Sequence, residues 1–269
     1  MRKQIKPVGS IQAMTELKYL SIKTGFISLA YFMGMIIFSI IMAARGTSNS
    51  LFDFVSNFRG GGSADVLPIV LGALPIIAIV LPLLIDHWET DMIVIRIKKK
   101  QRLFYDHLVF SFLISMFFTI IIAISGLIGA FIVTGHIQNL WGSKTGTLYF
   151  LLENKSFFPL FIPHVTSLKV WAYLISSRFL AILFISVCVI FLKVLIKKNS
   201  LVFFITLILL GTDGLFTERF SLFLGRIRIT MDTWLSPSEQ WFNLIYLFLW
   251  IVVLSFLCLK FYENKEFIG

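Results

Sequence analysis

Apolar runs long enough to cross a lipid bilayer constrain this chain more than any other feature of its sequence. A membrane helix needs about 20 apolar residues to cross roughly 30 Å of hydrocarbon. The predicted spans are residues 25–44, 66–85, 108–134, 176–196, 201–216 and 241–259, and a tight turn at 197–200 joins the fourth to the fifth. The sequence therefore predicts an all-α integral membrane protein, in which residues 1–269 form one transmembrane domain of six transmembrane helices.

The composition agrees with a membrane protein and excludes several other classes. Hydrophobic residues make up 58% of the 269 residues and charged residues only 14%, against about 25% charged residues in an ordinary soluble domain. Both cysteines, Cys188 and Cys258, lie inside predicted spans, so no structural disulfide is expected. Soluble enzymes, secreted disulfide scaffolds and disordered tails are excluded.

The segment before the first span has the pattern of an amphipathic helix. Apolar residues recur about every three positions, at Ile11, Met14, Leu17 and Leu20, with most polar residues between them. No convincing cleavage site follows the first apolar run, so it is not a signal peptide. We expect an N-terminal amphipathic helix that lies on the membrane interface.

The positive charges predict the orientation in the membrane. With the N-terminus inside, the cytosolic segments hold 15 of the 24 lysines and arginines and leave 9 outside, while the 14 acidic residues divide equally. Cytosolic loops carry the excess of Lys and Arg in membrane proteins. We therefore expect a multi-pass protein of the cell membrane, with both termini cytosolic. The net charge of +10 is then a topology signal, and membrane lipid rather than nucleic acid is the expected partner.

Motifs that capture energy or perform catalysis are absent from the sequence. There is no phosphate-binding loop, no H-E-x-x-H zinc motif and no G-x-S-x-G elbow. No acidic residue lies in the middle of a predicted span, and Asp213 comes closest, at the outer end of the fifth. We expect that the chain is not an enzyme, that it has no catalytic residue and that it binds neither a cofactor nor a metal.

The first cytosolic loop, residues 86–107, is the most informative segment. It begins acidic, passes through an apolar core and ends basic. As a helix, acids near its start and bases near its end match the macrodipole, and an apolar stripe between charged ends suits docking to a soluble partner. A positively charged loop held by lipid headgroups produces the same pattern.

Residues of this loop carry a family resemblance. A Glu after the second span, Glu89, precedes the basic run of Arg96, Lys98–Lys100 and Arg102. In this order they resemble the coupling helix and basic elbow of ABC transporter permeases of the type-2 exporter family. The six spans, the cytosolic termini and the tight turn at 197–200 are similar in layout. Asp106 and His107 stand where the family often has a Lys.

The resemblance implies a transport function. Such a permease forms half of the translocation pathway, pairs with a second permease copy and docks a separate cytosolic ABC ATPase subunit, which binds ATP and Mg. It also implies a cytosolic coupling helix between spans two and three. The residues expected to contact the ATPase are Glu89, Asp91, Met92, Ile93, Ile95, Arg96, Lys98, Arg102, Lys197 and Lys198.

Two features of the spans, together with Asp213 at the outer end of the fifth span, are candidates for a pathway or gate. Pro68, Pro75 and Pro82 are seven residues apart in the second span, which places them near one helix face. They indicate a flexible pathway helix, or they are simply prolines that a lipid-embedded helix tolerates. Arg178 is a substrate contact if the fourth span begins at residue 171, or it extends to the outer interface.

Small residues and an irregular outer segment complete the predictions. The spacing of Ser125 and Gly129, of Gly126 and Ala130, and of Ala30 and Gly34 favours close helix packing, more within the chain than between two copies. Residues 211–240 resemble the partly re-entrant outer helices of the same family; a loop on the membrane surface is the alternative. No counterpart is assigned to residues 135–177.

Two other functions remain open from the sequence. The chain is alternatively a stand-alone membrane immunity or scaffold protein that binds a peptide or a lipid. An intramembrane enzyme ranks last, because it needs convergent polar groups inside the spans.

Overall fold

The computed structural model describes residues 9–89, 100–213 and 221–264, and over these residues the chain is helical without a strand. Five helices are long and apolar enough to cross a membrane. They are Lys23–Ala44 within α1 (Gly9–Ala44), Pro68–His87 across η1 (Pro68–Ala73) and α3 (Leu74–Trp88), Gln101–Thr134 within α5 (Lys100–Thr134), α8 (Ser167–Leu195), and Pro237–Glu263 within α12 (Pro237–Asn264).

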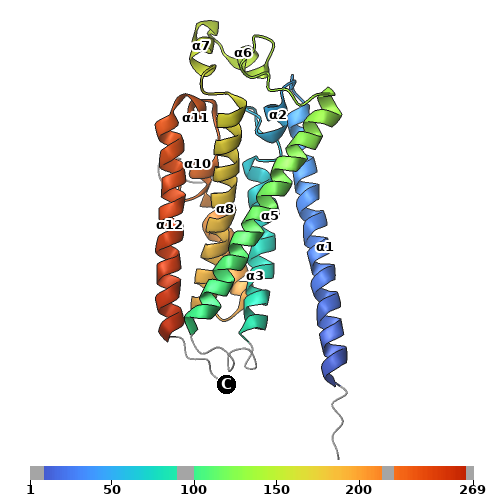
Figure 1. The fold of residues 1–269 in the computed structure, drawn as a ribbon, viewed down its shortest axis with the longest axis vertical. Helices are drawn as coiled ribbons and strands as arrows, with labels where there is room; N and C mark the ends of the chain where they lie inside the picture. Colours follow the sequence, from blue (N-terminus) through green and yellow to red (C-terminus); the bar gives the residue numbers. More distant parts are fainter. Residues whose placement is uncertain (1–8, 90–99, 214–220, 265–269) are drawn as a thin grey trace, which may run out of the picture.

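Helix α8 is the centre of the bundle. It packs against α3, α5, α12 and the short helix α9 (Asn199–Thr206). Ile182, Ile185 and Val189 on α8 have no exposed surface. Helix α1 lies at the edge of the bundle, where it contacts η1 and α5 (Figure 1).

The two ends of the bundle differ in construction. At one end, here called the cap end, lie the short helices α2 (Leu51–Val55), α6 (Thr147–Leu151), α7 (Phe158–Phe161) and α11 (Met231–Leu235) (Figure 1). The opposite end, here called the loop end, carries the last residues of α3, the first residues of α5 and the α8–α9 turn. Helix α1 begins and α12 finishes at the loop end. The predicted orientation would put this end in the cytosol.

The fifth predicted span, residues 201–216, is wrong in extent. Helix α9 continues into the π-helix η3 (Leu207–Gly211), and together they contain only 13 residues. At 1.5 Å per residue this is about 20 Å, too short for 30 Å of hydrocarbon. Gly211, a residue of low helix propensity, is the last residue of η3, and the Asp213 carboxylate two positions later accepts hydrogen bonds from residues 221–224.

Residues 221–235 run back along α8 toward the cap end. The Phe223 ring stacks on Phe184 at 5.5 Å, and the Trp234 ring lies 5.7 Å from Tyr173. Between them, the Ile227 carbonyl accepts a hydrogen bond from Arg178. Positions 173, 178 and 184 lie about 9, 16 and 25 Å from the first residue of α8. Where the sequence predicts the fifth of six long helices, the structure thus has the short helix α9–η3 followed by this return segment.

Two further boundaries correct the sequence predictions. The expected interfacial helix is not a separate element, because α1 runs without a break from Gly9 to Ala44. Residues 10–24 contain neither proline nor glycine, so no helix-breaking residue separates them from the first span. Helix α8 begins at Ser167 rather than 176, because residues 167–175 continue the hydrogen-bonded helix toward the cap end.

Glycines bring α5 close to the rest of the chain. A Cβ on Gly126 would lie 2.6 Å from Ser63 Oγ, and one on Gly129 would lie 3.0 Å from Ile40. These small-residue faces therefore pack within the chain, as predicted. Gly34 on α1 has no neighbour within 4 Å of a built Cβ, so the face around Gly34 does not show this packing.

Candidate functional site

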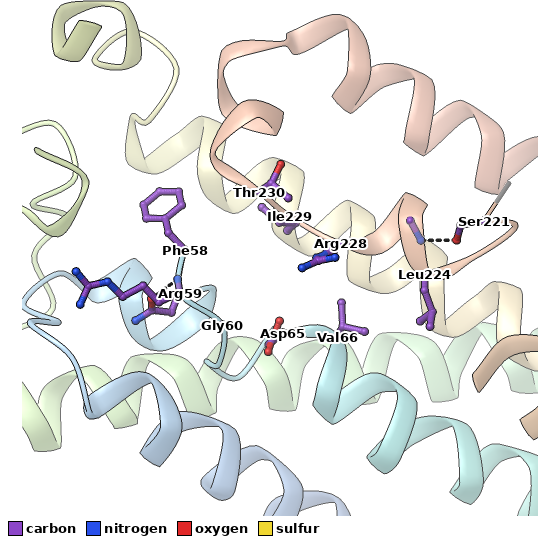
Figure 2. Close-up of a pocket in the computed structure, with 12 residues that line it drawn as sticks. Phe58, Arg59, Gly60, Asp65, Val66, Ser221, Leu224, Arg228, Ile229 and Thr230 are labelled. Carbon is purple, nitrogen blue, oxygen red and sulfur yellow. Dashed lines mark hydrogen bonds between the residues drawn. The ribbon is translucent and has the colours of Figure 1, made fainter. Parts of the chain in front are cut away.

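A pocket of about 470 Å³ opens between the α2–η1 connection and the return segment (Figure 2). One wall is formed by residues 57–60 with Asp65 and Val66, and the other by Ser221, Leu224, Gly225 and residues 228–230. In Figure 2, Arg228 extends from the return segment toward the wall that carries Asp65, while Arg59 points along the rim, away from Asp65. The pocket therefore combines charged and apolar surface.

A glycine-rich turn shapes the first wall. Gly60, Gly61 and Gly62 have φ angles of 92°, 93° and 101°, which residues with a Cβ rarely adopt. A Cβ on Gly62 would also lie 2.7 Å from the Val55 carbonyl oxygen. The Gly61 N–H donates to Asp65 Oδ2 at 2.8 Å. The backbone thus holds Asp65 at the pocket wall.

Asp213 holds the beginning of the return segment. Its carboxylate accepts hydrogen bonds from Ser221 Oγ at 2.6 Å and from the backbone N–H groups of residues 222, 223 and 224 at 2.7 to 2.8 Å. The residue is 3% exposed. Asp213 was predicted as a pathway or gating residue; here it satisfies buried donors where the chain turns back.

Arg178 on α8 is buried against the return segment. It is 1% exposed, and its Nη1 donates to the Ile227 carbonyl at 2.6 Å. Irregular backbone at membrane depth persists only where protein groups or water satisfy it. Arg178 therefore stabilises the return segment inside the bundle and does not extend to the interface.

A second polar cluster joins three helices at the loop end. Glu89, directly after α3, accepts a hydrogen bond from Tyr262 Oη of α12 at 2.8 Å. Its carboxylate lies 3.9 Å from His107 Nε2 on α5, and His107 has no exposed surface. Gln101 also donates to Glu263. The ends of α3, α5 and α12 are thereby connected through polar side chains.

An ion pair connects α3 to the α8–α9 turn. Lys193 Nζ lies 2.7 Å from Asp86 Oδ1 and donates to Asn199 Oδ1 at 2.6 Å and to the Lys197 carbonyl at 2.9 Å. Asn199 donates in turn to Asp86 Oδ2 at 2.7 Å. The Lys193 side chain is 5% exposed and that of Asp86 48%, so the pair lies at the boundary of the bundle.

The residues predicted to contact an ATPase fall into two groups. Asp91, Met92, Ile93, Ile95, Arg96 and Lys98 lie outside the described residues. Of the others, Arg102, Lys197 and Lys198 are exposed at the loop end, while Glu89 is partly buried among helix ends. The structure thus brings Glu89 next to Tyr262 and His107, and the turn with Lys197 and Lys198 next to Asp86.

Pro68 and Pro75 lie at a local change of helix type, whereas Pro82 lies inside α3. Pro68 begins the π-helix η1, in which the Leu74 N–H donates to the Ile69 carbonyl five residues earlier. Pro75 has no N–H for the Leu71 carbonyl, and this carbonyl accepts a hydrogen bond from Tyr31 Oη at 2.6 Å. Pro68 and Pro82 are buried. Their role in a pathway stays a prediction.

Several residues at these sites were not singled out from the sequence. They are Asp65, Asp86, Lys193, Arg228 and Tyr262. The sequence does carry a signal for Lys193, because a lysine inside an apolar run needs a partner. No sequence signal marks Tyr262 or Asp65 as a site residue, because their partners are distant in the sequence.

Among the described residues, no group of three or more His, Cys, Asp or Glu side chains is arranged to hold a metal ion. Comparison with protein-family models, curated proteins and solved structures finds no match for this chain.

Proposed function

We propose that this chain is the transmembrane permease subunit of an ATP-driven ABC exporter, in which it forms half of the translocation pathway. One observation carries the proposal. Asp86 and Glu89 flank the final residues of α3, directly before residues 90–99, and through their contacts they join α3 to α5, α8, α9 and α12. A force applied by a partner to residues 90–99 would therefore reach most of the bundle.

The return segment supports the same proposal. Asp213 and Arg178 hold residues 221–227 beside α8, in the place where the resemblance predicts partly re-entrant outer helices. A separate cytosolic ABC ATPase would bind ATP and Mg, and a second permease copy would complete the pathway. The five long apolar helices are compatible with this assembly.

Affinity purification from the native host tests the proposal. The tagged chain is crosslinked in cells, purified in mild detergent and analysed for ABC ATPase subunits and a second permease chain. The double variant Lys197→Glu/Lys198→Glu should lose the ATPase, because both side chains are exposed at the loop end. Lys144→Glu, an exposed lysine at the cap end, is the matched control and should retain it.

Absence of an ABC ATPase from the crosslinked wild-type sample would contradict the proposal. Equal recovery of the ATPase with the double variant and with Lys144→Glu would place the docking surface elsewhere. Size determination of the purified complex would reveal whether two permease chains are present.

A stand-alone immunity or scaffold protein is the second candidate. The pocket favours it, because a binding site at the cap end needs no energy from ATP. This function would survive deletion of every ABC ATPase gene near the gene for this chain, whereas export would not.

A further inference from the structure

We infer that the interior contact between α8, α11 and α12 is a hydration site, in which ordered water bonds to Ser177 of α8, Trp234 of α11 and Asn243 of α12. The inference goes beyond the proposed function. It concerns groups inside one chain, so it requires neither an ATPase nor a second permease copy, and the purified chain alone is sufficient to test it.

Three polar atoms lie buried where these helices meet. They are Ser177 Oγ, Trp234 Nε1 and Asn243 Oδ1, and within the described part of the chain none of them makes a hydrogen bond. The three residues are 1%, 0% and 2% exposed. A buried polar group that stays unpaired destabilises the folded state. Three such groups in one place therefore indicate a ligand that pairs with them.

Contacts with Tyr173 show that the three side chains converge. The Tyr173 ring packs edge-on against the Trp234 ring, with 5.7 Å between the ring centroids, and the Asn243 side chain lies beside the Tyr173 hydroxyl. Ser177 is four residues after Tyr173, which places it on the same face of α8. Helix α12 packs against both α8 and α11. The three groups therefore lie around Tyr173.

The chemistry of the three atoms matches water rather than an ion. The Trp234 indole N–H only donates, Asn243 Oδ1 only accepts, and the Ser177 hydroxyl does both. A cation does not accept the hydrogen bond that Trp234 offers, and an anion is repelled by Asn243 Oδ1. Water donates and accepts, and a buried water typically makes about three hydrogen bonds to groups of this kind.

The position of the site lets water reach it. Tyr173 and Asn243 each lie six residues after the first residue of their helix, which corresponds to about 9 Å. Both helices begin at the cap end (Figure 1). The path from this end of the bundle to the site is therefore less than about two helical turns long.

Trp141 provides an internal comparison in the same part of the molecule. Its indole N–H donates to Asp53 Oδ1 at 2.8 Å, and its ring lies 5.7 Å from that of Trp234. Neither tryptophan has any exposed surface. The two indoles therefore differ in what their N–H groups bind, and not in their exposure to bulk solvent.

Hydroxyl-radical footprinting of the purified full-length chain tests the inference. X-ray pulses generate radicals from water, including water bound inside a protein, and mass spectrometry locates the oxygen that is added to side chains. We expect Trp234 to be labelled about fivefold faster than Trp141, because buried water adjoins only the Trp234 indole. Tyr173 should be labelled as well.

Ser177→Ala and Ser186→Ala form a matched pair of variants, because both serines are buried on α8. The Ser186 hydroxyl donates to the Ile182 carbonyl at 2.9 Å, so its removal should leave the labelling of Trp234 unchanged. We expect Ser177→Ala to lower this labelling about twofold and Asn243→Leu about fivefold, because each removes a partner of the water. Thermal unfolding checks that each variant remains folded.

Equal labelling of Trp234 and Trp141 in the wild-type chain would overturn the inference. So would equal labelling of Trp234 in the Ser177→Ala, Asn243→Leu and Ser186→Ala variants. Native mass spectrometry identifies any other small molecule that the chain retains. Such a molecule, if Asn243→Leu removed it, would be the ligand in place of water and would also overturn the inference.

Discussion

The cap end and the loop end of this bundle are held together by different interactions. At the cap end, buried Asp53 accepts hydrogen bonds from Asn49, Ser50, Trp141 and Thr147. At the loop end, helix termini are joined by pairs in which one side chain is buried and the carboxylate is partly exposed, His107 with Glu89 and Lys193 with Asp86. Buried networks with every group satisfied are rigid, whereas partly exposed ion pairs contribute little. We therefore expect the loop end to open at lower cost than the cap end.

Aromatic rings strengthen the contrast. Trp141 is fully buried and lies 5.4 Å from Phe52, 4.3 Å from Phe58 and 5.7 Å from Trp234. These rings come from the α2 region, the α5–α6 connection and α11. Such pairs contribute about 0.5–1.5 kcal/mol each beyond their buried area. The cap end thus binds distant segments of the chain into one unit.

Removal of the Asp53 carboxylate should destabilise the cap end and cause the largest loss in the free energy of unfolding. Asp53→Ala leaves buried donors on Trp141, Thr147 and the backbone unsatisfied, and we expect a loss of about 3 kcal/mol in the free energy of unfolding. Denaturant or thermal unfolding in detergent measures it. Asp232→Ala, at an exposed position on α11, is the control. Equal stability of the two variants would mean that the Asp53 network does not hold the cap end.

Two glycines of the glycine-rich turn allow a matched comparison, with a smaller expected loss of stability. Gly60→Ala and Gly62→Ala both force a residue with a Cβ to a positive φ angle, but only the second Cβ meets backbone atoms, at 2.7 Å. We expect Gly62→Ala to unfold about 2 kcal/mol more easily than Gly60→Ala. Similar stabilities, measured under the same conditions, would show that the turn relaxes readily and that the cap end is less rigid than its contacts imply.

The sequence predicted the position of a helix where that position depends only on which residues belong in lipid. Hydropathy locates residues that belong in hydrocarbon, and five long apolar helices overlap the predicted spans. The same signal predicted a sixth span at 201–216. It failed there because the apolar helix ends at Gly211 after only 13 residues. Hydropathy shows that a segment is apolar, but not where its helix ends.

The candidate sites were less predictable, because they depend on pairs that are far apart in the sequence. Glu89 and Tyr262 are separated by 173 positions, and Arg178 and Ile227 by 49. Charge patterning marked Glu89 and Arg178 as residues of interest, but not their partners. Asp213 was expected to act in a pathway; its hydrogen bonds to residues 221–224 required knowledge of where the chain turns back.

A double-mutant cycle at Asp86 and Lys193 should show that the coupling energy of this loop-end ion pair is small. The carboxylate is about half exposed, so we expect a coupling energy of about 0.5–1 kcal/mol between Asp86→Asn and Lys193→Met. This value should fall further at high salt, as expected for an exposed charge. A coupling energy near that of the Asp53 network would remove the difference between the two ends.

The smallest effect on stability, and the most specific one on motion, is expected at Glu89. Glu89→Ala removes the acceptor of Tyr262 Oη, 2.8 Å away, and the negative charge 3.9 Å from His107. Other contacts of α3, α5 and α12 remain, so we expect a loss below about 1 kcal/mol in global unfolding. Hydrogen exchange should nevertheless accelerate in residues 100–107 and 259–263, where the helix ends open locally, and stay unchanged in residues 49–58. Acceleration at both ends alike would mean that Glu89 supports the whole bundle. Acceleration at neither would mean that the α3, α5 and α12 ends are held by their apolar contacts, with Phe104 and Tyr262 5.8 Å apart.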